Sequence, residues 1–196
     1  MKTILGLVLC GGLSSRMGRD KGLLEREGQI WAKAAGRKLE NLGLPVYYSL
    51  RPEQLEPYKI HIQEEAFLLD SPSLPYKGPL LGIMSAFLNH REYSILCLAC
   101  DMTHIQDSLL RKLIGKEKEN PGKSIVFRKG EDREPLCALY SQKDLSSFHD
   151  YFTMEERRSS SMMYLLDFIG PLYLEIEDRE AGFFLNENSP GDWMGN

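Results

Sequence analysis

The sequence lacks an apolar run of the length that a membrane-spanning helix needs, about 20 residues. Its longest strongly apolar stretches have the length of a strand, as in Ser94–Cys100. The first residues pass directly into a strand-like run and show no cleavable signal pattern. We therefore expect no membrane partner and a cytoplasmic location.

An excess of positive charge is also lacking. The chain carries 24 lysines and arginines against 28 aspartates and glutamates, a formal net charge of −4. Proteins that bind a nucleic acid backbone usually have a basic excess, so the balance argues against such a partner. A length of 196 residues suits one sizeable domain and is short for two, so residues 1–196 are predicted to form a single domain. The sequence does not fix the oligomeric state, and a monomer is the expectation.

Cysteine and histidine are too scattered to indicate a metal cluster. Cys97 and Cys100 have the spacing of redox sites, but they lie in an apolar, strand-like run. Residues three apart on a strand point to opposite faces, whereas redox motifs begin a helix, so both thiols are predicted to be buried and free. Cys10, Cys137 and the four histidines lack the close partners of a zinc site.

Apolar runs and helix-like patterns alternate along the chain, which predicts an α/β fold with a mostly parallel sheet between helices. The strand-like runs are Ile4–Cys10, Val46–Leu50, Ile60–Gln63, Ser94–Cys100, Ser124–Arg128, Pro135–Tyr140 and Leu172–Ile176. The helix-like segments are Ile30–Asn41, Leu80–Asn89, Ser108–Lys118, Lys143–Phe152 and Ser160–Ile169. Gly130–Arg133 has the composition of a hairpin turn, so the sheet is predicted to be mixed. Two prolines make Asp70–Lys77 a loop.

The segment Leu9–Lys21, which we call the signature loop, directly follows the first strand-like run. Its paired glycines, Gly11 and Gly12, allow backbone N–H groups to approach an anion closely. Arg16 and Lys21 add positive charge that a phosphate would require. The glycine spacing fits neither a Walker loop nor the dinucleotide fingerprint. Phosphate binding is the prediction, and an ordinary strand-to-helix turn is the alternative.

Three further segments accompany the signature loop in a defined order. The loop has the pattern Leu-x-Gly-Gly-x-Ser-x-Arg-Met-Gly-x-Asp-Lys, and it is followed by Asp70 with Gly78–Gly82, by Cys100–Met102 and by Phe184–Pro190. Together these segments resemble the molybdenum cofactor guanylyltransferases, which belong to the Rossmann-like nucleotidyltransferases. The first segment alone is shared by many nucleotidyltransferases, whereas the four together are specific, and they span nearly the whole chain.

The resemblance implies a fold and a reaction. The fold would be the three-layer, Rossmann-like nucleotidyltransferase fold with a mostly parallel, mixed central sheet. The enzyme would transfer GMP from GTP to the terminal phosphate of the molybdopterin cofactor and release pyrophosphate. The reaction would depend on Mg²⁺, and GTP and the molybdopterin cofactor would be the binding partners.

Catalytic roles are implied for three residues. Lys21 and Arg16 would face the triphosphate, where positive charge meets the leaving phosphates. Asp101 follows a strand-like run, and ligands bind at the carboxyl ends of strands in open α/β sheets, so it would hold the metal. We expect Lys21 and Asp101 at opposite ends of the same triphosphate. For Asp101 the alternative is a helix N-cap or a turn.

Further residues are implied to bind the nucleotide or the acceptor. The implied nucleotide-binding residues are Leu9, Cys10, Gly11, Gly12, Lys21, Asp70, Gly78, Pro79 and Asp101. The carboxylate of Asp70 could accept hydrogen bonds from N1–H and the 2-amino group of guanine, with an Asx turn as the alternative. Asn186 and Asn188 would lie near the acceptor or the metal, with a polar turn before Pro190 as the alternative.

Other functions stay open at this point. One is a related nucleotidyltransferase that uses CTP or a sugar phosphate, and another is a catalytically silent nucleotide-binding protein. The Gly11–Gly12 pair and Gly78–Gly82 favour the guanine type, whereas Lys21 and Asp101 argue against silence. Tyr48–Arg51 stands where similar proteins often carry an asparagine at the strand end, which leaves one nucleotide contact without a candidate.

Overall fold

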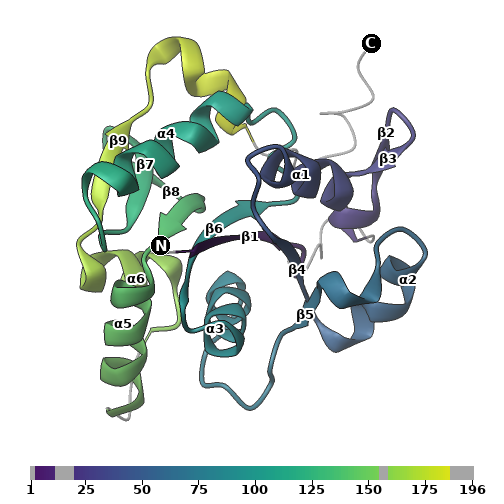
Figure 1. The fold of residues 1–196 in the computed structure, drawn as a ribbon, viewed down its shortest axis with the longest axis horizontal. Coiled ribbons are helices and arrows are strands. Elements are labelled where there is room, and N and C mark those ends of the chain that lie inside the picture. The colour runs from purple at the N-terminus through teal and green to yellow at the C-terminus, as the bar shows by residue number, and fades with distance from the viewer. Residues whose placement is uncertain (1–2, 12–19, 155–158, 186–196) are drawn as a thin grey trace.

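A computed structural model describes residues 3–11, 20–154 and 159–185. These form three layers, a central sheet with a layer of helices on each of its faces (Figure 1). The seven strands of this sheet have the order β5-β4-β1-β6-β8-β7-β9. Their bounds are β1 Thr3–Leu9, β4 Val46–Leu50, β5 Phe67–Leu69, β6 Tyr93–Ala99, β7 Ile125–Lys129, β8 Asp132–Tyr140 and β9 Leu172–Glu175. The predicted α/β class is therefore confirmed.

Helices cover both faces of the sheet (Figure 1). The α-helices are α1 Trp31–Glu40, α2 Leu55–Lys59, α3 Pro79–Asn89, α4 Asp107–Glu119, α5 Gln142–Met154 and α6 Met162–Ile169. Short 3-10 helices are η1 Lys21–Leu23, η2 Pro52–Gln54, η3 Glu64–Ala66 and η4 Asp178–Phe184. Helices α1 and α4 contribute to one buried apolar cluster, whereas α3, α5 and α6 contribute to the other. Within the described part of the chain, none of the helices is long and apolar enough to cross a membrane.

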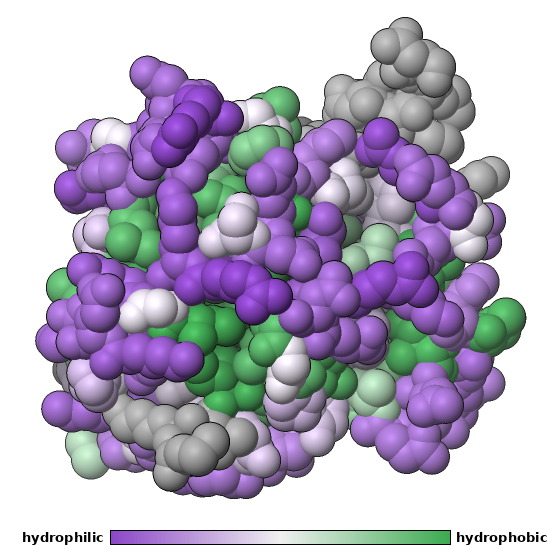
Figure 2. Space-filling view, turned by 45° about the horizontal axis from the view of Figure 1, so that its top comes forward, coloured by the Kyte–Doolittle hydropathy of each residue, from purple (hydrophilic) through white to green (hydrophobic). Residues whose placement is uncertain are grey.

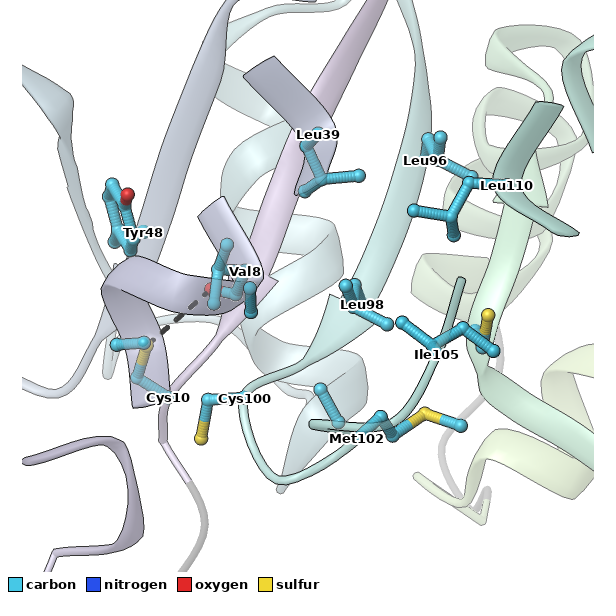
Figure 3. Close-up of a cluster of buried hydrophobic side chains, with 14 of the residues drawn as sticks. Val8, Cys10, Leu39, Tyr48, Leu96, Leu98, Cys100, Met102, Ile105 and Leu110 are labelled. Atoms are coloured by element: carbon cyan, nitrogen blue, oxygen red, sulfur yellow. Dashed lines mark hydrogen bonds between the residues drawn. The ribbon is translucent and has the colours of Figure 1, made fainter. Parts of the chain in front are cut away.

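The strands supply side chains to both clusters because successive residues point to opposite faces. In β6, Leu96 and Leu98 belong to the cluster under α1 and α4, whereas Ile95 and Cys97 belong to the opposite one. Figure 3 shows Leu96 projecting from β6 toward Leu110 of α4, and Leu98 projecting toward Ile105. Hydrophilic residues cover most of the face in Figure 2, with apolar ones between them. Covering on both faces explains why β6 reads as one continuous apolar run.

Strand directions determine where a ligand can bind. Strand β1 runs parallel to β4 and β6, β4 parallel to β5, and β7 parallel to β9, whereas β8 is antiparallel to β6 and β7. The turn between β7 and β8 includes Gly130 with a φ of 59°, which confirms the predicted hairpin and the mixed sheet. The carboxyl ends of β1, β4 and β6 consequently lie along one edge.

Several features differ from the sequence prediction. The strand predicted at Ile60–Gln63 is wrong, because α2 ends at Lys59 and a turn follows in which Ile60 is 80% exposed. The strand beside β4 is β5 instead. A hairpin of β2 (Glu25–Arg26) and β3 (Gln29–Ile30), the short helix α2 and the 3-10 helices were not predicted. The other predicted strands and helices are confirmed, with ends shifted by up to three residues, and the loop at residues 70–77 is confirmed.

Candidate functional site

A pocket lies at the carboxyl edge of the sheet, over the ends of β1, β4 and β6 and beside the start of α3. Eight of the residues predicted to bind or act on a nucleotide line it: Leu9, Cys10, Gly11, Lys21, Asp70, Gly78, Pro79 and Asp101. Residues far apart in the sequence therefore meet in one place, as the order of the motifs predicted. The other four predicted residues, Gly12, Arg16, Asn186 and Asn188, lie outside the described part of the chain.

Five lining residues were not predicted: Ser49, Gly82, Ala99, Cys100 and Leu136. Ala99 and Cys100 are neighbours of Asp101 at the end of β6, so their places follow from that motif. Ser49 lies in β4. No local sequence pattern indicates that its hydroxyl reaches the pocket.

One end of the pocket holds an ion pair. Lys21 begins η1, Asp101 follows β6, and the Lys21 ammonium donates to the Asp101 carboxylate at 2.8 Å. Their side chains are only 17% and 18% exposed, so the pair is less screened by solvent than a surface salt bridge. The two groups are thus in contact, which does not meet the expectation that they occupy opposite ends of a triphosphate. Of the two alternatives for Asp101, the helix N-cap is wrong, because α4 begins at Asp107 after its N-cap Gln106, whereas Asp101 does lie in a turn after β6.

This end of the pocket offers one carboxylate, that of Asp101, as a candidate metal ligand. Within the described ranges, no cluster of three or more His, Cys, Asp and Glu side chains could hold a metal ion. Mg²⁺ at nucleotide sites is commonly held by one or two carboxylates, with phosphate oxygens and waters completing its shell. A single carboxylate at a strand end, Asp101, fits this mode of binding.

The other end of the pocket holds a carboxylate with a neutral partner. Asp70 follows β5 and is buried, and Ser49 Oγ donates to its Oδ1 at 2.7 Å. Burial raises the pKa of Asp70 from 3.8 to about 6, while the Ser49 hydrogen bond and the charge of Arg51 act in the opposite direction. The Asx turn is disfavoured, because the residue two positions on, Pro72, has no N–H to donate.

Glycines leave space around the side chains of Asp70 and Ser49. A Cβ on Gly11 would lie 3.2 Å from Asp70 Oδ2, so the bare backbone of Gly11 allows a close approach to this carboxylate oxygen. A Cβ on Gly82 would lie 2.3 Å from Ser49 Oγ and would displace the hydroxyl that holds Asp70. Gly78 has a φ of 56° and is the N-cap of α3, with Pro79 at the first position of the helix. That conformation favours glycine, and proline suits the first turn.

The two cysteines of the pocket are apolar lining rather than reactive groups. Cys10 and Cys100 lie near one another at the ends of β1 and β6 (Figure 3) and are buried. Cys10 Sγ contacts the carbonyl oxygen of Val8 at 3.9 Å, and burial raises the pKa of this thiol well above its usual value. All four cysteines of the chain are free, and Cys97 is also buried, which confirms the prediction.

Comparisons with known proteins agree with this geometry. The profile of the MobA-like NTP transferase domain matches residues 6–165. A probable molybdenum cofactor guanylyltransferase of Flavobacterium johnsoniae is 32% identical over 96% of this chain and 94% of its own. The molybdenum cofactor guanylyltransferase of Pseudomonas fluorescens is 31% identical over 84% of this chain and 80% of its own. The crystal structure of molybdopterin-guanine dinucleotide biosynthesis protein A from Archaeoglobus fulgidus superposes with a TM-score of 0.74 at 22% identity, covering 95% and 93% of the two chains.

Proposed function

Because the chain belongs to the MobA-like NTP transferase family and is therefore a nucleotidyltransferase, we propose that it transfers GMP from GTP to the terminal phosphate of the molybdopterin cofactor. The observation that carries the proposal is the pocket itself, in which Asp70 lies at one end and the Lys21–Asp101 pair at the other. We further propose that residues 1–196 act as one monomeric domain in the cytoplasm, with neither a nucleic acid nor a membrane as a partner.

Guanine selection is assigned to Asp70. Its carboxylate can accept from both N1–H and the 2-amino group of guanine, a pair of donors that adenine and cytosine do not offer. Ser49 holds one carboxylate oxygen, and Gly11 leaves space beside the other. Keeping a buried carboxylate without a cationic hydrogen-bond partner is costly in the free protein, and two hydrogen bonds from the base would offset that cost.

The transfer itself joins two anions, so positioning and counter-charge determine its rate. A terminal phosphate oxygen of the acceptor forms a bond to the α-phosphorus of GTP, and the bond from that phosphorus to the bridging oxygen breaks, which releases pyrophosphate. The ammonium of Lys21 would stabilise the negative charge on the departing phosphates. Asp101 would hold Mg²⁺, which when bound supplies charge neutralisation at the phosphate oxygens. The resemblance is the basis for two further assignments. Arg16 would contact the triphosphate, and Asn186 and Asn188 would lie near the acceptor or the metal.

The experiment that tests the proposal measures pyrophosphate release from ATP, CTP, GTP and UTP in turn, with and without Mg²⁺ and with and without the molybdopterin cofactor. We expect release from GTP that requires both the cofactor and the metal. A preference for CTP would support the cytidylyl alternative. Binding of GTP without release under any of these conditions would support a silent nucleotide-binding protein.

A further inference from the structure

The short helices η2 and α2 lie against both described ends of the signature loop. Gln54, at the end of η2, donates through Nε2 to the carbonyl oxygen of Cys10 at 3.1 Å. The same Nε2 atom donates to Asp20 Oδ2 at 2.5 Å. Cys10 follows β1 where the signature loop begins, and Asp20 immediately precedes Lys21. One carboxamide therefore connects the two ends of the loop.

A buried tyrosine holds the same aspartate from the other side. Tyr58 of α2 donates to Asp20 Oδ1 at 2.9 Å, and the backbone N–H of Gly22 donates to this oxygen at 3.0 Å. Tyr58 is fully buried, and burial raises its pKa, which keeps the hydroxyl a donor. A Cβ on Gly22 would lie 2.1 Å from the Tyr58 oxygen, so the absence of a side chain at Gly22 is what lets this hydroxyl approach. Both oxygens of Asp20 are thus engaged.

Gln54 is itself held in a single orientation. Its Oε1 accepts from the backbone N–H of Arg51 at 2.9 Å, directly after β4, and its side chain is buried. The carboxamide therefore cannot rotate without losing its hydrogen bond to Arg51 or its hydrogen bonds to Cys10 and Asp20. Because its three bonds end on Arg51, Cys10 and Asp20, any shift of Asp20 is resisted by the ends of both β1 and β4.

We propose that Gln54 and Tyr58 are positioning residues that act through Asp20 to hold Lys21 beside Asp101. Neither contacts the reacting atoms. The inference rests on the proposed function, since it gives the placement of Lys21 a purpose in the transfer. Hydrogen bonds to a carboxylate are stronger than neutral ones, so the two side-chain donors on Asp20 can fix the residue that follows it. A displacement of about 1 Å in a reacting group can lower a rate by about 10²-fold.

Two variants disturb the loop contacts with little change of volume. Tyr58→Phe removes only the hydroxyl that Asp20 accepts from. Gln54→Glu keeps an oxygen for the N–H of Arg51 but replaces the Nε2 donor, so both loop contacts are lost. Tyr140→Phe is the matched control, because Tyr140 is also fully buried and its hydroxyl donates to Pro135 O at 2.8 Å, in the apolar cluster on the opposite face of the sheet.

The experiment combines steady-state kinetics with amide hydrogen exchange. The two loop variants should lower kcat by about tenfold, which is less than the loss of about 10²-fold that a displacement of Lys21 by about 1 Å would cause. Exchange should quicken at the amides of Gly22, Leu23 and Leu24, which bond to Asp20 and Lys21. The control should lose thermal stability comparably, with kcat and exchange at these amides unchanged.

The outcomes separate the inference from the proposed function. If the wild type releases pyrophosphate from no nucleotide, the proposed function fails, and the role of the two residues in catalysis fails with it. If the wild type is active and either loop variant keeps its kcat, the positioning role is overturned, whatever the exchange rates. An equal loss of kcat in Tyr140→Phe would also overturn it, because general destabilisation would then explain the effect.

Discussion

Two carboxylates at the same edge of the sheet have contrasting surroundings. Asp101 follows β6 and is paired at 2.8 Å with the ammonium of Lys21. Asp70 follows β5, is buried and accepts from the neutral hydroxyl of Ser49. An ion pair at a pocket wall can be exchanged for a metal ion on one side and a phosphate on the other. A carboxylate with a neutral partner is better suited to reading neutral donors, such as those on the edge of a base.

Under the proposed function, the two carboxylates would divide one pocket into two parts with separate tasks. We propose that Lys21 and Asp101 form a phosphate end and that Asp70, Ser49 and Gly11 form a base end of this pocket. If this division is correct, a change at one end should leave the task of the other end intact. The following predictions test the roles given to the two ends.

The largest effect is expected at the phosphate end. Asp101→Ala should raise the activation free energy of the transfer by about 3 kcal/mol or more, which is the effect of removing one preorganised electrostatic partner. Its preference for GTP over ITP should not change, because the base end is intact. Steady-state rates of pyrophosphate release with Mg²⁺ measure both quantities. A near wild-type rate would show that the metal assignment is wrong.

A second prediction concerns the stability of the free protein. The pKa of Asp70 is raised to about 6 in the folded state, so between about pH 4 and pH 6 the folded protein keeps a proton that the unfolded chain releases. Stability therefore falls as pH rises through this window, by about 3 kcal/mol for a rise from 3.8 to about 6. Asp70→Asn, which cannot ionise, should be the more stable protein above pH 6 and equally stable at pH 4.

Urea unfolding of the wild type and Asp70→Asn at pH 4, 5, 6 and 7 gives the difference between their free energies of unfolding directly, because the other titrating groups are common to both. A difference that does not change with pH would mean that Asp70 is not the titrating group. Saturating GTP should reduce the difference, since the base would stabilise the ionised carboxylate.

A smaller effect is expected for Lys21→Ala, which removes one charge-assisted contact to the phosphates. The affinity for GTP should fall by about 1.5–3 kcal/mol, and the affinity for GMP, which lacks the departing phosphates, should fall less. Isothermal titration of both nucleotides measures the two changes. Equal losses for GTP and GMP would place Lys21 at the α-phosphate or the ribose instead.

The sequence was sufficient for most of the fold because the central strands are covered on both faces. The continuous apolar runs of β1 and β6 follow from that covering. The wrong strand at Ile60–Gln63 has the opposite cause: Ile60 and Ile62 alternate with polar residues as on a strand, but only Ile62 is buried. The true edge strand, β5, has three residues and is too short for a periodic signal.

The site residues that the sequence predicted belong to recognisable motifs. The residues that it did not predict reach the site through contacts between distant segments. Ser49 reaches Asp70 only because Gly82 of α3 has no side chain to displace its hydroxyl. Likewise, nothing local to Gln54 indicates that it bonds the carbonyl of Cys10. The one signal in the sequence was Gly22: a glycine directly after the loop lysine can indicate the close approach of another group, here the Tyr58 hydroxyl.

The most direct test of the two-part pocket is a calorimetric titration of GTP, ITP and GMP into the wild type, Asp70→Asn and Lys21→Ala. We predict that Asp70→Asn lowers the affinity for GTP by about 1–3 kcal/mol and that for ITP, which lacks the 2-amino group, by less. It should leave the ratio of GTP to GMP affinity unchanged, and only Lys21→Ala should alter that ratio. Loss of GTP and ITP affinity by equal amounts in Asp70→Asn, or a changed GTP-to-GMP ratio in that variant, would contradict the account.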